Sequence, residues 1–369
     1  MRIDEVTKLE RENIEDVTAL TPLQEGMLFH FLKDPSANYY FEQLSMGISG
    51  PVDISLIEKA WNIVVETNGS LRTVFRWEKM QNPTQIVLAK YQLPLRYHDF
   101  FSKDHGEYDE NEARKLLDQL KRADQKETFD LREVPFRVTL CRITDNEYEL
   151  IISNHHILFD GWSTGIIITE FFNVYNDLVS GIVPASRVKT PFKDFVRWNQ
   201  QQDIQKQELF WGKYLDGVDW ENRTELPFKN KKPDTGSTGI KKTTNGSSVF
   251  PVNLSSEKKS LLDNFVKKHK ITIATFLYGA WGRLLQKYTD SNDVIMGTTV
   301  SGRSAKIAGI EEIVGLFINT VPLRVRTKTN GGSSEGGSIL EMLVHLNDEL
   351  QTREAFENTP LLKIKEYGN

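Results

Sequence analysis

Two adjacent histidines, an aspartate and a glycine stand close together in the segment NHHILFDGWS at 154–163. An imidazole can take or hold a proton near neutral pH because its unperturbed pKa is about 6.5. Asp160 follows His156 by four residues, so its carboxylate can hold the local turn or pair with a distant arginine. Gly161 is expected to supply the backbone freedom of a tight turn. This spacing suggests one compact site for proton handling.

Two other interpretations of a histidine pair stay open on spacing alone. His155 and His156 can be strand-end side chains that bond to nearby backbone, or they can be metal ligands. A metal site needs further ligands at suitable spacing. The chain has one cysteine and seven histidines, and those outside the pair are scattered, so we expect no metal.

Composition and charge narrow the class of protein. The chain has 369 residues, which is long for one core and sufficient for two, because single cores rarely exceed about 250 to 300 residues. A net charge of -5 argues against binding to nucleic-acid phosphates. The single cysteine, Cys141, lies in an alternating run and predicts a buried thiol in a reducing compartment. With a charged N-terminus and no apolar run of about 20 residues, we expect a cytoplasmic protein without a membrane partner.

Apolar periodicity predicts a mixed α/β chain. In the first half it predicts helices at 21–32, 53–67, 109–125 and after Asp160, and strands at 39–48, 71–77, 85–89, 136–143 and 147–153. In the second half it predicts helices at 255–270, 273–288 and 338–357, and strands at 293–302 and 316–327. The segment 227–248 has almost no large apolar residues and predicts a loop, and 330–338 predicts a flexible tether, natural or engineered.

The segment HHILFDG resembles the HHxxxDG signature of the condensation domains of nonribosomal peptide synthetases, which acyltransferases of the chloramphenicol acetyltransferase type share. Five further segments resemble the other motifs of that family in the same order: LTPLQEGMLFH at 20–30, SLRTVFR at 70–76, PFKDFVRW at 191–198, VGLFINTVPLR at 314–324 and ENTPLLKI at 357–364. Six ordered matches cover nearly the whole chain. One departure is the segment ETNGS before LRT, where no histidine stands, so no histidine of this second motif is carried over.

The resemblance implies an α/β fold of two chloramphenicol acetyltransferase-like lobes that form a V-shaped pseudodimer with a central tunnel. We expect the N-terminal lobe with the HHxxxDG motif at 1–185 and the C-terminal lobe at 186–369. The chain stops soon after the sixth motif, so this second lobe is expected to be truncated at its C-terminus.

The implied reaction is amide bond formation between a donor acyl or peptidyl thioester and an acceptor aminoacyl thioester. The resemblance implies no intrinsic cofactor, because both substrates ride on phosphopantetheine arms of upstream and downstream carrier domains, with an adenylation domain adjacent. His156 is expected to act as a general base or to position the amine, and the Gly161 amide to face the oxyanion. Asp160 is expected to pair with Arg303 or Arg72 and to shape the loop.

The remaining site residues are assigned by position. His155 should point away from the site because side chains alternate along a strand. Ser163 is expected to cap the next helix or to line the tunnel, and Trp162 to pack in the core. Asn319 and Thr320 are expected to line the tunnel from the second lobe.

Three other functions are compatible with the same motif. They are a coenzyme-A-dependent acyltransferase, an epimerization domain and a non-catalytic docking module, although the intact HHxxxDG argues against the last. The segment PLQEGMLFH favours a donor that ends in a D-residue, while the amino acids joined stay undetermined.

Overall fold

The computed structural model describes residues 9–101, 109–185, 188–218, 241–242, 248–249, 251–327 and 338–368. These residues form two compact units, and each is built from two stretches of chain. The first unit is Met1–Asp203 with Ser301–Asn319, and the second is Ile204–Val300 with Thr320–Asn369.

This division differs from the expected boundary between residues 185 and 186. The reason lies in helix α5 (Phe192–Gln200), which packs within the first unit. Its Phe195 is buried against Ile310 and Phe317. Lys193 forms an ion pair of 2.6 Å with Asp16 of strand β1 (Ile14–Ala19). Apolar burial therefore holds the segment 301–319 in the first unit, although it lies late in the sequence.

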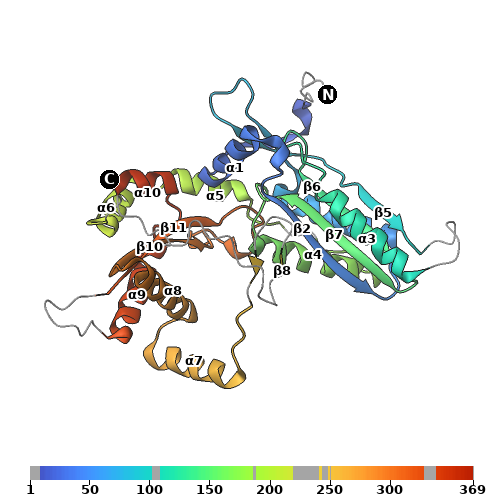
Figure 1. Ribbon diagram of the computed structural model, residues 1–369. Helices are drawn as coiled ribbons and strands as arrows, with labels where there is room; N and C mark the ends of the chain where they lie inside the picture. The colour runs from blue at the N-terminus through green and yellow to red at the C-terminus, as the bar shows by residue number, and fades with distance from the viewer. Residues whose placement is uncertain are drawn as a thin grey trace. The chain divides into compact units, whose positions relative to one another are not determined.

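The first unit contains a four-stranded sheet with the order β2-β7-β6-β5. Its strands are β2 (Phe41–Ser49), β5 (Leu95–Asp99), β6 (Phe136–Arg142) and β7 (Glu147–His155). Strand β7 pairs antiparallel with both β2 and β6, whereas β5 pairs parallel with β6. Strand β7 lies inside the sheet, between β2 and β6 (Figure 1). It ends at His155, so the histidine pair stands at the C-terminal end of an inner strand.

Helices cover both faces of this sheet. They are α2 (Ile54–Thr67), α3 (Glu110–Asp124) and α4 (Gly161–Val179). Leu150 and Ile152 of β7 face one side and pack with α2 and α4, whereas Ile151 faces α3. Cys141 packs beside Ile151 and is fully buried, as predicted, and burial raises the pKa of its thiol to about 12. Because β7 is buried on both faces, its residues 150–152 are all apolar.

A three-stranded sheet with the order β1-β4-β3 completes the first unit. Its strands are β1 (Ile14–Ala19), β3 (Thr73–Arg76) and β4 (Thr84–Leu88), and short 3-10 turns lie at Arg11–Asn13, Pro35–Ala37, Gly69–Arg72 and Ile310–Glu312. The expected strand at 71–77 is thus shorter, because a 3-10 turn precedes it. Helix α1 (Pro22–Lys33) starts at a capping box of Thr21 and Gln24. The buried Gln24 also donates to the Ile157 carbonyl at 3.0 Å, which ties α1 to the histidine turn.

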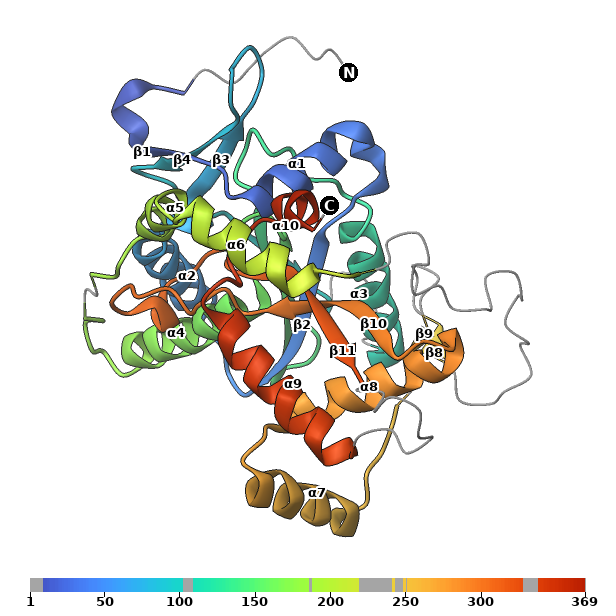
Figure 2. The same ribbon diagram turned by 90° about the vertical axis from the view of Figure 1, so that its left-hand side faces the viewer.

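The second unit packs helices on the paired strands β10 (Asp293–Val300) and β11 (Asn319–Arg326). Its helices are α6 (Ile204–Leu215), α7 (Ser256–His269), α8 (Ile273–Thr289), α9 (Ile339–Glu354) and α10 (Leu361–Tyr367). Helices α8 and α9 run side by side (Figure 2). A Cβ at Gly282 of α8 would lie 2.6 Å from Val325 of β11, so this glycine permits close packing of helix on strand.

The expected loop at 227–248 and tether at 330–338 fall almost entirely outside the described residues. Of the loop, the structure describes only Lys241, Lys242 and Ser248, which belong to the short paired strands β8 (Lys241–Lys242) and β9 (Ser248–Val249). Of the tether, it describes only Ser338, which caps α9.

Candidate active site

His156 lies in the turn between β7 and α4, with its side chain 19% exposed. Its Nδ1 is 2.7 Å from the carbonyl oxygen of Phe159. A carbonyl can only accept, so this bond places the proton on Nδ1 and leaves the lone pair of a neutral ring on Nε2. The turn therefore orients the imidazole as a hydrogen-bond acceptor or base at Nε2.

The backbone of His156 is fixed by the start of strand β2. Its N–H donates to the Tyr40 carbonyl at 2.8 Å. Tyr40 has a φ of +63°, which is uncommon for a bulky residue. Its hydroxyl lies 2.7 Å from Nδ1 of His30 in α1. Tyr40 therefore connects the segment 20–30, which contains His30, to the histidine turn.

His155 is buried, with an exposed fraction of 2%. Its Nδ1 accepts from the Ile157 N–H at 3.1 Å, and Phe31 packs edge-on against its ring. Burial, with a smaller effect from His156, lowers the pKa of His155 to about 3. The side chain is thus a neutral part of the core, as its expected structural role requires.

Replacing His155 by Asn is expected to flatten the acid limb of the stability profile. In the wild type, His155 has a pKa of about 6.5 in the unfolded chain and of about 3 in the folded chain. Its contribution to the free energy of unfolding is therefore fully present above pH 6.5 and is lost as the pH falls from 6.5 to 3. Between pH 7 and pH 5, this one histidine lowers the free energy of unfolding by about 2 kcal/mol. Urea unfolding of the wild type and of His155→Asn at pH 7 and pH 5 measures the difference. If the free energy of unfolding fell by the same amount in both proteins, the prediction would be contradicted.

Asp160 is fully buried, with an exposed fraction of 0%, and both carboxylate oxygens accept hydrogen bonds. Oδ1 accepts from the Ser163 N–H at 3.0 Å and pairs with Arg303 at 3.3 Å. Oδ2 accepts from the backbone N–H groups of Phe317 at 3.0 Å and Ile318 at 3.3 Å. Asp160 is also the N-cap of α4, and its bonds to Phe317, Ile318 and Arg303 fasten the histidine turn to the segment 301–319.

Arg303 is the partner of Asp160, as one of the two expected pairings states. Its other guanidinium nitrogen donates to the carbonyls of Ile310 at 2.6 Å and Ile313 at 2.9 Å. The guanidinium also lies 4.0 Å from the centre of the Phe317 ring. Burial lowers the pKa of Arg303, and Asp160 counteracts this. Both terminal nitrogens of the guanidinium are therefore hydrogen-bonded inside the protein, whereas its Nε is buried without a partner among the described residues.

The alternative pairing of Asp160 with Arg72 is wrong. Arg72 instead forms an ion pair of 2.7 Å with Glu15 and donates to the carbonyls of Leu88 and Glu66. Its guanidinium thus joins the turn before β3 to strands β1 and β4. Sequence spacing gave no basis for choosing between the two arginines.

Ser163 and Trp162 differ from expectation in burial, because Ser163 is buried and Trp162 is exposed. Ser163 is fully buried, and its hydroxyl contacts Asp160, Gly315 and Arg303, so it belongs to the polar network around the aspartate. The cap of α4 is Asp160 rather than Ser163. Trp162 is 56% exposed, and its indole N–H donates to the Glu311 carbonyl at 3.2 Å, so its assignment to the core is wrong.

Gly161 opens helix α4 without a left-handed φ. An added Cβ would meet no atom within 4 Å, so the expected need for backbone freedom is wrong. As the first residue of the helix, its N–H has no intrahelical acceptor. None of the hydrogen bonds of the described chain uses this amide. It therefore points out of the helix start as a free donor, as the oxyanion hypothesis requires, and that hypothesis stays a prediction.

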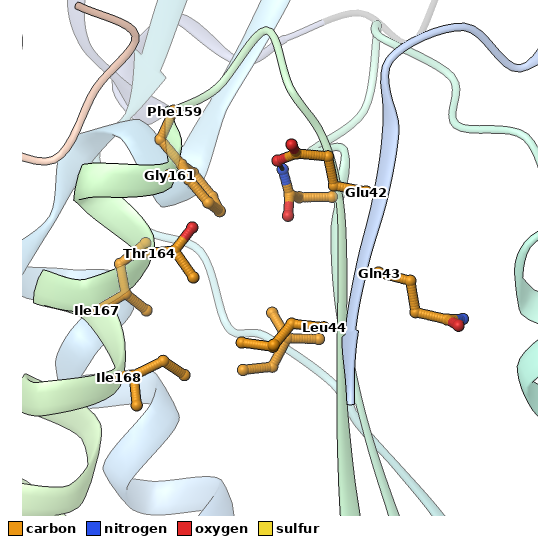
Figure 3. A pocket seen from close by; sticks show the side chains of 10 residues that line it. Glu42, Gln43, Leu44, Phe159, Gly161, Thr164, Ile167 and Ile168 are labelled. Carbon is orange, nitrogen blue, oxygen red and sulfur yellow. Dashed lines mark hydrogen bonds between the residues drawn. The ribbon is translucent and has the colours of Figure 1, made fainter. Parts of the chain in front are cut away.

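A pocket of about 180 Å³ lies between the start of α4 and strands β2 and β7 (Figure 3). It is lined by apolar side chains and by a smaller polar group: Leu44, Ile152, Phe159, Ile167 and Ile168, with Glu42, Gln43, Asn154, Gly161 and Thr164. Leu44 projects into the pocket, whereas the Gln43 side chain turns to the opposite side of β2 (Figure 3).

Glu42 is the functional candidate that sequence reasoning missed. Its Oε2 is 3.6 Å from Nδ1 of His156 and accepts from Asn154 at 3.4 Å. Glu42 and Asn154 are direct neighbours in the antiparallel register of β2 and β7. The only signal in the sequence was the alternation of EQL in the predicted strand, which does not give the pairing register.

Asn319 and Thr320 stand at the start of β11, at the division between the two units. Asn319 is half-buried and Thr320 is exposed. Their placement along a tunnel stays a prediction.

The described part of the chain holds neither a cluster of metal ligands nor a membrane helix. No group of three or more His, Cys, Asp or Glu residues there could hold a metal ion. No helix in that part is both long and apolar enough to cross a membrane.

Comparison with known families now adds to this geometry. Residues 14–367 match the family model of the condensation domain. The chain belongs to the condensation domain family. The condensation domain is 34% identical over 356 residues to tyrocidine synthase 2 of Brevibacillus parabrevis, a match that covers 96% of this chain. It is 32% identical over 358 residues to surfactin synthase subunit 2 of Bacillus subtilis (strain 168), covering 97% of the chain. The chain spans 9% of the length of each of these synthases.

Solved structures show the same fold. The condensation domain aligns with a variant of the starter condensation domain of rhizomide synthetase RzmA, crystallised with C8-CoA and Leu-SNAC, at a TM-score of 0.71 and 17% identity. That match covers 95% of this chain and 74% of the other. The first condensation domain of the calcium-dependent antibiotic synthetase aligns at a TM-score of 0.68 and 17% identity, covering 95% and 76%. The expected family and its α/β fold are thereby confirmed.

Proposed function

We propose that this condensation domain joins an acceptor aminoacyl amine to a donor acyl or peptidyl thioester. The observation that carries the proposal is the 2.7 Å contact between Nδ1 of His156 and the Phe159 carbonyl oxygen. Its Nδ1–H is held by the Phe159 carbonyl, which leaves Nε2 to accept from an amine. The same turn sets the free amide of Gly161 at the start of α4, where it can stabilise negative charge on the thioester oxygen.

The proposed step needs only the two substrates, because every bond and proton in it is accounted for. The amine nitrogen attacks the thioester carbonyl, a C–N bond forms, the C–S bond breaks, and the proton lost by the amine ends on the released thiol. His156 holds or relays that proton, and the Gly161 amide meets the oxyanion of the tetrahedral intermediate. Holding the two tethered reactants together adds to the rate, with an upper scale of about 7 to 11 kcal/mol for such positioning.

The partners in this proposal are two carrier domains in the cytoplasm. An upstream carrier presents the donor and a downstream carrier presents the acceptor, each on a phosphopantetheine arm, with an adenylation domain adjacent. The long synthases that this chain resembles support this arrangement, because the chain corresponds to a small part of each.

Incubating the chain with two loaded carrier domains tests the proposed function. We expect a dipeptidyl product on the acceptor carrier and an emptied donor carrier, both detected by mass spectrometry of the intact carriers. An acyl-CoA donor that reacts without any carrier would favour a coenzyme-A-dependent acyltransferase instead. Inversion of the donor residue without chain growth would favour epimerization, and either result would contradict the proposal.

A further inference from the structure

We propose that the pocket beside Glu42 binds the acceptor aminoacyl group, with the carboxylate taking its α-ammonium and the apolar wall taking its side chain. This inference rests on the proposed function and specifies its substrate class as acceptors with an apolar side chain. It combines three observations: the composition of the wall, the volume of the pocket and the position of one carboxylate.

The wall of the pocket is built from side chains of a strand pair and one helix. Leu44 and Ile152 come from β2 and β7, and Ile167 and Ile168 come from α4. Leu44 is exposed even though it faces this wall, so apolar surface stays in contact with water there. Covering such a surface with an apolar group is favourable.

The size of the pocket suits one amino-acid side chain. A dry apolar cavity of about 150 Å³ accepts benzene. The pocket beside Glu42 has about 180 Å³, which is room for a leucine or phenylalanine side chain. Gly161 contributes to this space, because a Cβ there would project where no atom lies within 4 Å.

The negative charge of Glu42 at the pocket favours binding of the acceptor over binding of the donor. Glu42 Oε2 accepts from Asn154, whereas none of the described hydrogen bonds uses Oε1. A free carboxylate oxygen attracts an ammonium group, which the acceptor carries on its reacting nitrogen, whereas an N-acylated or peptidyl donor carries none beside its thioester carbonyl. Glu42 Oε2 lies 3.6 Å from Nδ1 of His156, so an ammonium bound there is beside the same ring whose Nε2 would receive the proton.

A matched pair of substitutions on helix α4 tests the apolar wall. Thr164 lines the pocket, whereas Thr169 is exposed and does not. Glycyl, alanyl, leucyl and phenylalanyl thioesters of N-acetylcysteamine serve as acceptors with one fixed donor. We expect Thr164→Phe to lower kcat/KM for the leucyl and phenylalanyl acceptors at least tenfold relative to glycyl. Thr169→Phe should leave the order of acceptors as in the wild type. The same order in both variants would overturn the inference.

Glu42→Gln tests the charge. We expect the KM for a leucyl acceptor to rise at least tenfold while the KM for the donor stays the same. An unchanged acceptor KM, or an equal rise for both substrates, would overturn the role of the carboxylate.

Binding without turnover separates this inference from the proposed function. Leucinamide is a probe with the α-ammonium and side chain of an acceptor but no thioester, and N-acetyl-leucinamide lacks the charge. We expect saturation-transfer NMR to detect leucinamide on the wild type, with a clear loss on Glu42→Gln and with N-acetyl-leucinamide. This result with no amide product from any carrier pair would overturn the proposed function and support the pocket. Equal signals in all three cases would overturn the pocket whatever the turnover.

Discussion

His156→Ala is expected to lower the rate of amide formation by about 10²- to 10⁴-fold, the usual contribution of a positioned acid or base. The imidazole is partly exposed, and its side chain has one hydrogen bond, to the Phe159 carbonyl. Its removal therefore takes away the acceptor at Nε2 and little packing. The rate is measured with loaded carriers under single-turnover conditions, which separates bond formation from carrier exchange.

A surface histidine provides the control for this loss. His345 is exposed on α9, so His345→Ala should keep both the melting temperature and the rate. His156→Ala should keep the melting temperature and lose the rate. If His156→Ala condensed at the wild-type rate, the histidine turn would not be the active site.

Asp160→Asn is expected to lower the free energy of unfolding by roughly 3 to 5 kcal/mol, the cost of breaking a buried ion pair on one side. Both carboxylate oxygens only accept, from backbone N–H groups and from Arg303. An amide at this position turns one acceptor into a donor that faces another donor, and it leaves Arg303 without its counter-charge. Urea unfolding of both proteins at pH 7 measures the difference.

The same substitution in an exposed ion pair calibrates the effect. Asp263 pairs with Lys259 at 2.9 Å on the surface of α7, so Asp263→Asn should cost less than about 1 kcal/mol. The double variant Asp160→Asn with Arg303→Met should lose less stability than the sum of its single variants, because the two groups interact directly. An unchanged unfolding curve for Asp160→Asn together with lost turnover would assign Asp160 to the chemistry rather than to the architecture.

Local signals in the sequence predicted much of the site. The alternation of 147–153 and the helical spacing after Asp160 placed the histidines at a strand end and the turn before a helix, as found for β7 and α4. A buried histidine beside a partly exposed one follows from the same alternation. These features depend on neighbours within a few residues, so a single sequence contains them.

Contacts between distant segments could not be predicted in this way. Glu42 and Asn154 are 112 residues apart and meet only through the register of two strands. Arg72 and Arg303 are equally plausible partners of Asp160 until the fold brings the segment 301–319 beside the turn. The aromatic character of Trp162 wrongly suggested a core position, because this second residue of α4 faces outward.

The discontinuous first unit has a consequence for the order in which the protein can mature during synthesis. Asp160 takes hydrogen bonds from Phe317, which follows it by 157 residues, and the chain of the second unit up to Val300 is translated in between. A ribosome that has finished the HHxxxDG segment has therefore not yet made the groups that satisfy its aspartate. The catalytic turn can reach its final form only when translation has passed Ile318, so it belongs to the last parts of the molecule to become native.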